Sequence, residues 1–266
     1  MVGHGDGTKL PMTPALIAAT VILLAGAAVA WPVGWPIAAV VVVFLLTVTL
    51  WANRRDDLAL RDAAALSAAL WILIRLPVVG IWPLPAALAL VAVIVLTGPR
   101  GTLSRWRKWF RVGTIGPSTR LLCAVIVVLT AVALLVWQQS TDGGLPSTYT
   151  GLIDSVPTPV AIAGIFLFLV VNGAVEDSVW SGVLLTAARG TMPAPVAIAV
   201  TVLSFGIAHL DGVPNGPIGV VMVIAWGIVL SLLRLRTGGM LATYIAHVLA
   251  DATIVALLVP SLLSTK

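Results

Sequence analysis

The chain has 266 residues, of which 60% are hydrophobic and 9% are charged, and its mean hydropathy is +1.11. Ordinary soluble domains carry a charge on about a quarter of their residues, so this composition excludes a soluble globular protein and indicates a polytopic membrane protein. The net charge of +5 comes from basic residues in short loops between apolar runs, which argues against a nucleic-acid partner. The single cysteine, Cys123, excludes an intrachain disulfide.

Nine apolar segments follow one another along the chain, most of them within the range of about 17 to 25 residues that a helix needs to cross hydrocarbon. Pro77, Pro83 and Pro85 crowd the junction between the third and fourth segments, where we expect a tight helical hairpin. The sequence therefore predicts an all-α, polytopic membrane bundle of about eight or nine transmembrane helices. The segments are approximately 13–31, 34–52, 62–80, 83–98, 121–138, 159–187, 194–210, 217–234 and 239–258.

The basic residues predict the orientation of the bundle, because loops rich in Lys and Arg stay in the cytoplasm. In a nine-span topology Lys266 lies on one side and Arg75 within a span, whereas thirteen of the fifteen Lys and Arg residues share the other side. We therefore expect a cytoplasmic N-terminus and a C-terminus outside. The thirteen residues are Lys9, Arg54, Arg55, Arg61, Arg100, Arg105, Arg107, Lys108, Arg111, Arg120, Arg189, Arg234 and Arg236.

The longest cytoplasmic loop, 99–120, interleaves aromatic and basic residues. Helical spacing would put Leu103, Trp106, Phe110 and Trp109 near one face, with Arg105, Arg107, Lys108 and Arg111 around it. Such a pattern is typical of a segment that lies flat on a membrane, so we expect residues 103–111 to bind the anionic inner leaflet. A solvated basic loop is the alternative.

An outer loop rich in Gly, Ser, Thr and Pro divides the chain into two regions. Residues 1–140 form the first region, in which we expect five spans without a buried acid or histidine, together with the basic loop. Residues 155–260 form the second region, a core of four spans that contains all the candidate chemistry.

Glu176 is the only glutamate in the chain, and it stands beside Asp177 in an apolar stretch long enough to cross a bilayer. Two of the three histidines, His209 and His247, also lie in apolar segments, and Asp251 follows His247 by four residues. A charge at membrane depth costs about 2.5 kcal/mol or more, so an ionisable residue there predicts a functional site.

Helix geometry predicts that these groups meet. At 1.5 Å per residue, Glu176 and His209 lie about 20 and 23 Å from the cytoplasmic surface, and His247 and Asp251 lie about 12 and 18 Å from it. Side chains at i and i+4 share a face, as His247 and Asp251 do. Asp177 points about 100° away from Glu176, so we expect one of these carboxylates to act and the other to support it.

Three motifs in these segments resemble those of the CPBP intramembrane proteases, the group that contains the type 2 CAAX prenyl endopeptidase and bacterial bacteriocin-processing proteins. The family pattern EExxxRG corresponds to EDSVWSG at 176–182, FxxxH to FGIAH at 205–209, and HxxxN to HVLAD at 247–251. The resemblance covers about residues 160–255. It implies an intramembrane endopeptidase with a peptide or protein substrate, in the plasma membrane of a bacterium.

Peptide hydrolysis needs an activated water, a base for its proton and donors for the oxyanion. Glu176 suits the base, and the resemblance implies that His209 positions the water while His247 and Asp251 bind the oxyanion or hold the imidazole. The resemblance favours catalysis without a cofactor. A zinc site of Glu176, His209 and His247, as in a metalloprotease, is the alternative.

Two supporting positions depart from the family pattern, since Asp177 stands where the family usually has Glu and Ser181 where it has Arg. Phe205, the third supporting residue, fits the pattern. A catalytically silent relative that binds a membrane partner would explain Ser181. A proton-coupled transporter would also use buried acids and histidines, although the first five spans show no matching repeat.

Overall fold

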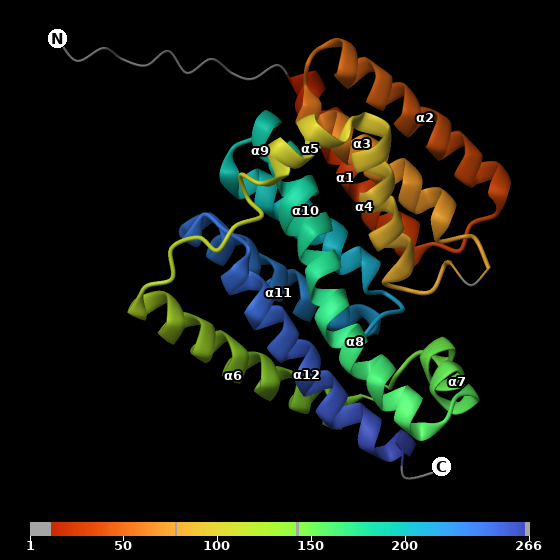
Figure 1. The fold of residues 1–266 in the computed structure, drawn as a ribbon, viewed down its shortest axis with the longest axis vertical. Helices are drawn as coiled ribbons and strands as arrows, with labels where there is room; N and C mark the ends of the chain where they lie inside the picture. Colours follow the sequence, from red (N-terminus) through yellow and green to blue (C-terminus); the bar gives the residue numbers. More distant parts are fainter. Residues whose placement is uncertain (1–11, 78, 142–143, 264–266) are drawn as a thin grey trace.

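The computed structural model describes residues 12–77, 79–141 and 144–263, and these form helices joined by short connections (Figure 1). Each of the nine predicted segments contains a helix, so the predicted all-α polytopic bundle is confirmed. The helices are α1 (Met12–Ala30), α2 (Trp35–Arg54), α3 (Leu58–Leu73), α4 (Leu84–Thr97), α5 (Pro99–Trp106), α6 (Pro117–Ser140), α7 (Ser147–Ser155), α8 (Thr158–Glu176), the π-helix η1 (Asp177–Leu184), α9 (Leu185–Thr191), α10 (Ala194–Ala208), α11 (Gly216–Thr237) and α12 (Leu241–Leu263).

Six of the described helical stretches are long and apolar enough to cross a membrane, and α4 and α10 are shorter apolar helices. The longest stretch, Thr158–Thr191, runs without interruption through α8, η1 and α9. Large aliphatic side chains are exposed along α2, α6 and α8, for example Val40, Val128 and Leu167. Such a surface is compatible with lipid and unsuited to water.

The helices pack in two groups that share an interface (Figure 1). In the first group α3 packs against α1, α2 and α4. In the second group α12 packs against α6, α8 and α11. α10 joins the groups because it contacts both α1 and α11. The predicted division at residues 140–155 is thus crossed by extensive packing, and its status as a domain boundary stays a prediction.

Small residues allow the two groups to approach closely. A methyl group on Gly26 of α1 would overlap the backbone carbonyl of Ser204 in α10. Because nothing separates these backbones, the Ser204 hydroxyl donates to Ile22 O at 2.6 Å and accepts from Gly26 N at 3.1 Å. Trp180 Nε1 of η1 donates to the same hydroxyl at 3.3 Å, so Ser204 ties three helices together.

The first region does contain a buried acid, contrary to the expectation from sequence. Asp62, at the start of α3, is 2% exposed. One of its oxygens lies 2.8 Å from Arg61 Nη2 and the other 2.7 Å from Arg105 Nη2, so two cations offset the cost of its burial. Trp106 Nε1 donates to the second oxygen at 3.3 Å. These bonds fasten α5 to α3.

The basic loop differs from the continuous surface helix that its pattern predicted. α5 ends at Trp106, and the Trp109 ring is buried where Gly182 of η1 leaves room for it. The loop then runs beside the α11–α12 turn, where Arg111 Nε donates to Gly238 O at 2.7 Å. Phe110, at 64% exposed, is free to contact lipid. Binding of residues 103–111 to the anionic leaflet stays a prediction.

Candidate active site

The change from α8 to η1 positions two neighbouring carboxylates. Glu176 ends the α-helix and Asp177 begins the π-helix, in which the backbone hydrogen bonds are shifted by one residue. Both side chains are buried, at 5% and 3% exposed. A methyl group at Gly173, one turn earlier, would touch the His247 ring at 3.5 Å, so this glycine lets α8 and α12 pack closely enough for the carboxylates to reach His247.

His247 lies between these carboxylates. Glu176 Oε2 is 3.3 Å from Nε2 of the imidazole, and Asp177 Oδ1 is 3.1 Å from Nδ1. The two acids therefore bind two different nitrogens of one ring, which agrees with the expectation that they could not converge on a single atom. A carboxylate on each nitrogen fixes the orientation of the ring and stabilises its doubly protonated form.

Asp251 completes one side of the cluster. Its Oδ1 is 3.9 Å from His247 Nε2, and its Oδ2 accepts from Asn172 Nδ2 at 3.0 Å. Trp82 Nε1 lies 2.9 Å from both Asn172 Oδ1 and Glu176 Oε1. One hydrogen-bonded network thus links Glu176, His247 and Asp251, and the indole N–H orients the oxygen of Glu176 that does not face His247.

His209 approaches from the end of α10. Its Nδ1 is 3.0 Å from Phe205 O, and because a carbonyl only accepts, Nδ1 carries the hydrogen. Nε2 is then left for water or a substrate. The Phe205 ring meets His209 edge-on at 4.7 Å between centroids and lies 6.4 Å from His247, so it packs between the two imidazoles.

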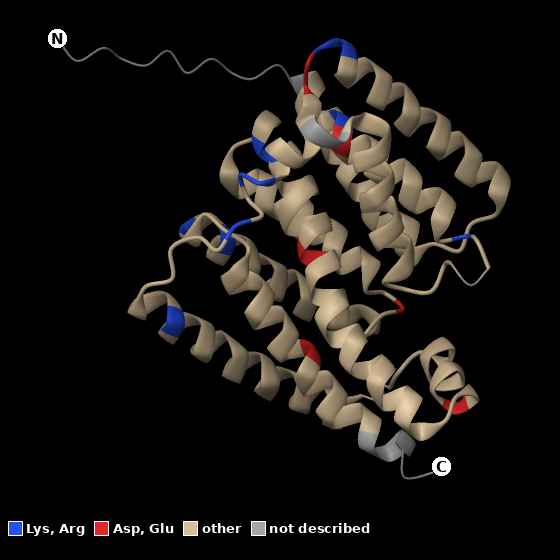
Figure 2. Cartoon of the chain, viewed as in Figure 1, with Lys and Arg blue, Asp and Glu red and all other residues tan. Residues whose placement is uncertain are grey.

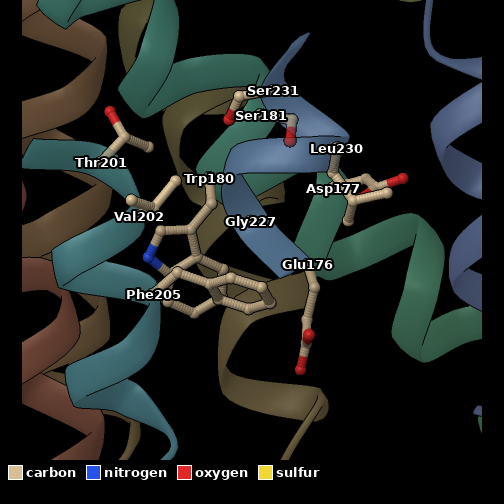
Figure 3. A pocket seen from close by; sticks show the side chains of 10 residues that line it. All are labelled: Glu176, Asp177, Trp180, Ser181, Thr201, Val202, Phe205, Gly227, Leu230 and Ser231. Carbon is tan, nitrogen blue, oxygen red and sulfur yellow. The ribbon is translucent and has the colours of Figure 1, made fainter. Parts of the chain in front are cut away.

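A small cavity of about 10 Å³ adjoins Asp177 on the side away from the groove. Asp177 Oδ2 is buried and has no hydrogen-bond partner among the described residues. Figure 3 shows Ser181 and Ser231 near this cavity, while the Glu176 carboxylate points in the opposite direction. Ser181 therefore lies beside Asp177 and on the side away from the Glu176 carboxylate.

Glu176 and His209 both line a large groove with a volume of about 1200 Å³. His247 and Asp251 reach it as well, whereas Asp177 and Ser181 do not. Most of the wall is apolar and comes from α6, α8, α11 and α12. The four predicted catalytic residues therefore share one accessible space, and the two polar supporting residues lie behind them.

Three residues in this site were missed by sequence reasoning. Asn172 was detectable, because it is an amide in the middle of an apolar segment, one turn before Glu176. Trp82 gave no signal, since it lies 94 positions away from Glu176. Tyr149 of α7 donates to Trp82 O at 3.3 Å. Burial raises the pKa of the Tyr149 phenol, and the nearby carboxylates of Glu176 and Asp251 raise it further, so it stays a donor at neutral pH.

A catalytic zinc ion would need three grouped protein ligands and an open fourth position. No three His, Cys, Asp or Glu side chains in the described ranges are grouped so that they could hold a metal ion. Both nitrogens of His247 face carboxylates, and Nδ1 of His209 faces its own helix. The set Glu176, His209 and His247 thus does not fit a preformed zinc site.

Comparison with known proteins gives one result. Residues 158–253 match the family model described as "Type II CAAX prenyl endopeptidase Rce1-like". Neither curated proteins nor solved structures include a significant match to the chain. The matched segment begins at α8 and ends two residues after Asp251, so it contains every residue of the three motifs. Residues 158–253 of this integral membrane protein are therefore a domain of the Rce1-like family, a family of CAAX-type endopeptidases.

Proposed function

We propose that the protein is an intramembrane endopeptidase that hydrolyses a peptide bond with a water activated by Glu176. The observation that carries this proposal is the position of Glu176, which is buried at the wall of a large apolar groove with one oxygen held by Trp82 and the other facing His247. A carboxylate removed from bulk water and held in one orientation is a competent general base.

The proposed reaction moves one proton through Glu176. The carboxylate takes a proton from water, and the hydroxide oxygen bonds to the carbonyl carbon of the substrate. The carbon–nitrogen bond then breaks, and Glu176 returns the proton to the leaving amine. Each atom is accounted for by water, the peptide and this single carboxyl group.

The neighbouring groups would support these steps in different ways. The imidazolium of His247 would stabilise the negative charge that develops near Glu176, while Asp177 and Asp251 hold its ring. His209 is proposed to contact the water or the oxyanion through Nε2, because its Nδ1 is engaged by Phe205 O. Removing one such donor typically costs about 10²–10³ in kcat.

The test compares purified protein with its Glu176→Gln variant on a library of fluorogenic peptides in detergent. The amide keeps the shape and can still accept from Trp82, but it cannot take a proton, so we expect cleavage to be lost while the thermal unfolding temperature is retained. Asp56→Asn is the matched control, because Asp56 is an exposed acid between α2 and α3 that does not line the groove. Cleavage by Glu176→Gln at the natural rate would refute the proposed base.

A second candidate is a catalytically silent relative that binds a membrane partner. The unpartnered Oδ2 of Asp177 favours it, since the family pattern has an Arg at position 181, where this chain has Ser. The same peptide library separates the two candidates. The silent relative would cleave no peptide, with Glu176 or with Gln at that position.

A further inference from the structure

The groove around Glu176 opens at one end of the bundle. Its rim is formed by residues 80–83 between α3 and α4, residues 145–156 that include α7, and residues 211–214 between α10 and α11. None of its lining residues, among those the structure describes, belongs to α5, to α9 or to the α11–α12 turn. The opening therefore lies at the end where these three connections meet.

The opposite end carries most of the positive charge, as the blue residues in Figure 2 show. Arg107 and Lys108 lie in the connection after α5, Arg54 and Arg236 lie in the last turns of α2 and α11, and Arg189 lies in α9. At the groove end Asp154 lies in α7 and Asp211 lines the groove, and the basic end also contains Asp56, Asp57 and Asp62.

Of the Lys and Arg residues that the structure describes, Arg75 alone lies at the groove end. Its guanidinium is partly exposed and is held in place, since it donates to Trp31 O at 3.0 Å and Val33 O at 3.3 Å and stacks on the Trp71 ring. The groove end therefore carries one described cation, whereas the opposite end carries the others.

Because basic loops stay in the cytoplasm, this asymmetry orients the groove. We propose that the groove opens to the non-cytoplasmic side of the membrane and admits the apolar, membrane-embedded segment of a polypeptide, which is cleaved in the outer half of the bilayer. The cleavage, though not the direction of opening, rests on the function proposed above.

The wall of the groove indicates the chemistry of this occupant. Ile126 and Leu134 from α6, Phe168 from α8 and Ile254 from α12 line it, while its ionisable groups gather around Glu176 and at the rim. An apolar segment can pack against this wall, and because lipid tails are as apolar as its side chains, van der Waals contact and not the hydrophobic effect would hold it there. A charged, water-soluble peptide would have to give up its hydration with few polar partners in return.

The direction of opening is tested by cysteine labelling in intact bacterial cells. Cys123 is the single cysteine of the chain, so Cys123→Ser gives a background without thiols. Into it we would place Asp211→Cys at the rim, Leu152→Cys on α7 and Lys108→Cys at the basic end, all three positions being exposed. A membrane-impermeant maleimide should label the first two before permeabilisation and the third only afterwards.

Labelling of Lys108→Cys but not Asp211→Cys in intact cells would overturn the proposed direction of opening. Labelling of both would overturn the nine-span topology on which it depends. Neither result requires enzymatic activity, so both remain informative if the protein cleaves nothing. We expect the same labelling pattern when Glu176→Gln is added, because labelling reports accessibility and does not depend on cleavage.

The place of cleavage is tested separately with two membrane-anchored reporters. Both carry one apolar transmembrane segment, and the peptide sequence that the purified enzyme cleaves best is placed at its outer flank in one and its inner flank in the other. We expect at least tenfold faster cleavage of the outer-flank reporter, abolished by Glu176→Gln. Preferred cleavage of the inner-flank reporter would contradict the proposed access.

Discussion

Asp177 is expected to act on catalysis only through His247. Two substitutions separate the effect of its hydrogen bond to the imidazole from the effect of its charge. Its Oδ1 lies 3.1 Å from His247 Nδ1, and both side chains are buried. In Asp177→Ala the Nδ1–H would be buried without an acceptor, which costs about 1–3 kcal/mol. If this cost is paid in the transition state, kcat falls about 5- to 150-fold, since 1.36 kcal/mol corresponds to tenfold.

Asp177→Asn should be much milder. The amide oxygen still accepts from Nδ1–H and only the charge is lost, so we expect a fall of a few fold in kcat. Asp177 does not line the groove, and KM should therefore stay within about twofold in both variants.

Steady-state cleavage of one fluorogenic peptide by the natural protein, both Asp177 variants and the control Asp56→Asn would measure these effects. The expected order of kcat is natural protein, then Asn, then Ala, with the control unchanged. The reasoning is refuted if Asp177→Ala keeps full kcat, or if either variant changes KM while kcat stays constant. Thermal unfolding of each variant separates loss of orientation from loss of fold.

Three further predictions concern stability and metals. Asp62→Ala should lower the free energy of unfolding by about 3–5 kcal/mol, because it leaves Arg61 and Arg105 without their shared carboxylate. In the same denaturation assay the control Asp154→Ala, at an exposed position, should change that free energy by less than about 0.5 kcal/mol. Gly26→Ala should cost about 1–3 kcal/mol, since the methyl group meets the carbonyl of Ser204, and an unchanged melting temperature would contradict the close packing of α1 on α10. Cleavage should survive incubation with a strong chelator; reversible loss that zinc restores would instead support the metal-dependent mechanism.

The sequence by itself determined the spans and the set of candidate residues. A bilayer requires every backbone polar group to be satisfied within its own helix, so about twenty apolar residues in a row predict a helix without reference to the rest of the chain. Ionisable residues such as Glu176 and His247 are conspicuous in that setting because burying them is costly. Both signals are local, and a single sequence contains them in full.

Only the tertiary structure decided which groups touch. The backbone changes to a π-helix at Asp177, and Glu176 and Asp177 face different nitrogens of His247; hydropathy carries no trace of either feature. Trp82 contacts Glu176 although 94 residues separate them in the sequence. The Trp109 ring is buried against Gly182 and does not face the membrane as the pattern of its loop predicted. These contacts depend on how closely separate helices approach, which is set by shape and packing over the whole bundle and by no periodicity within one segment.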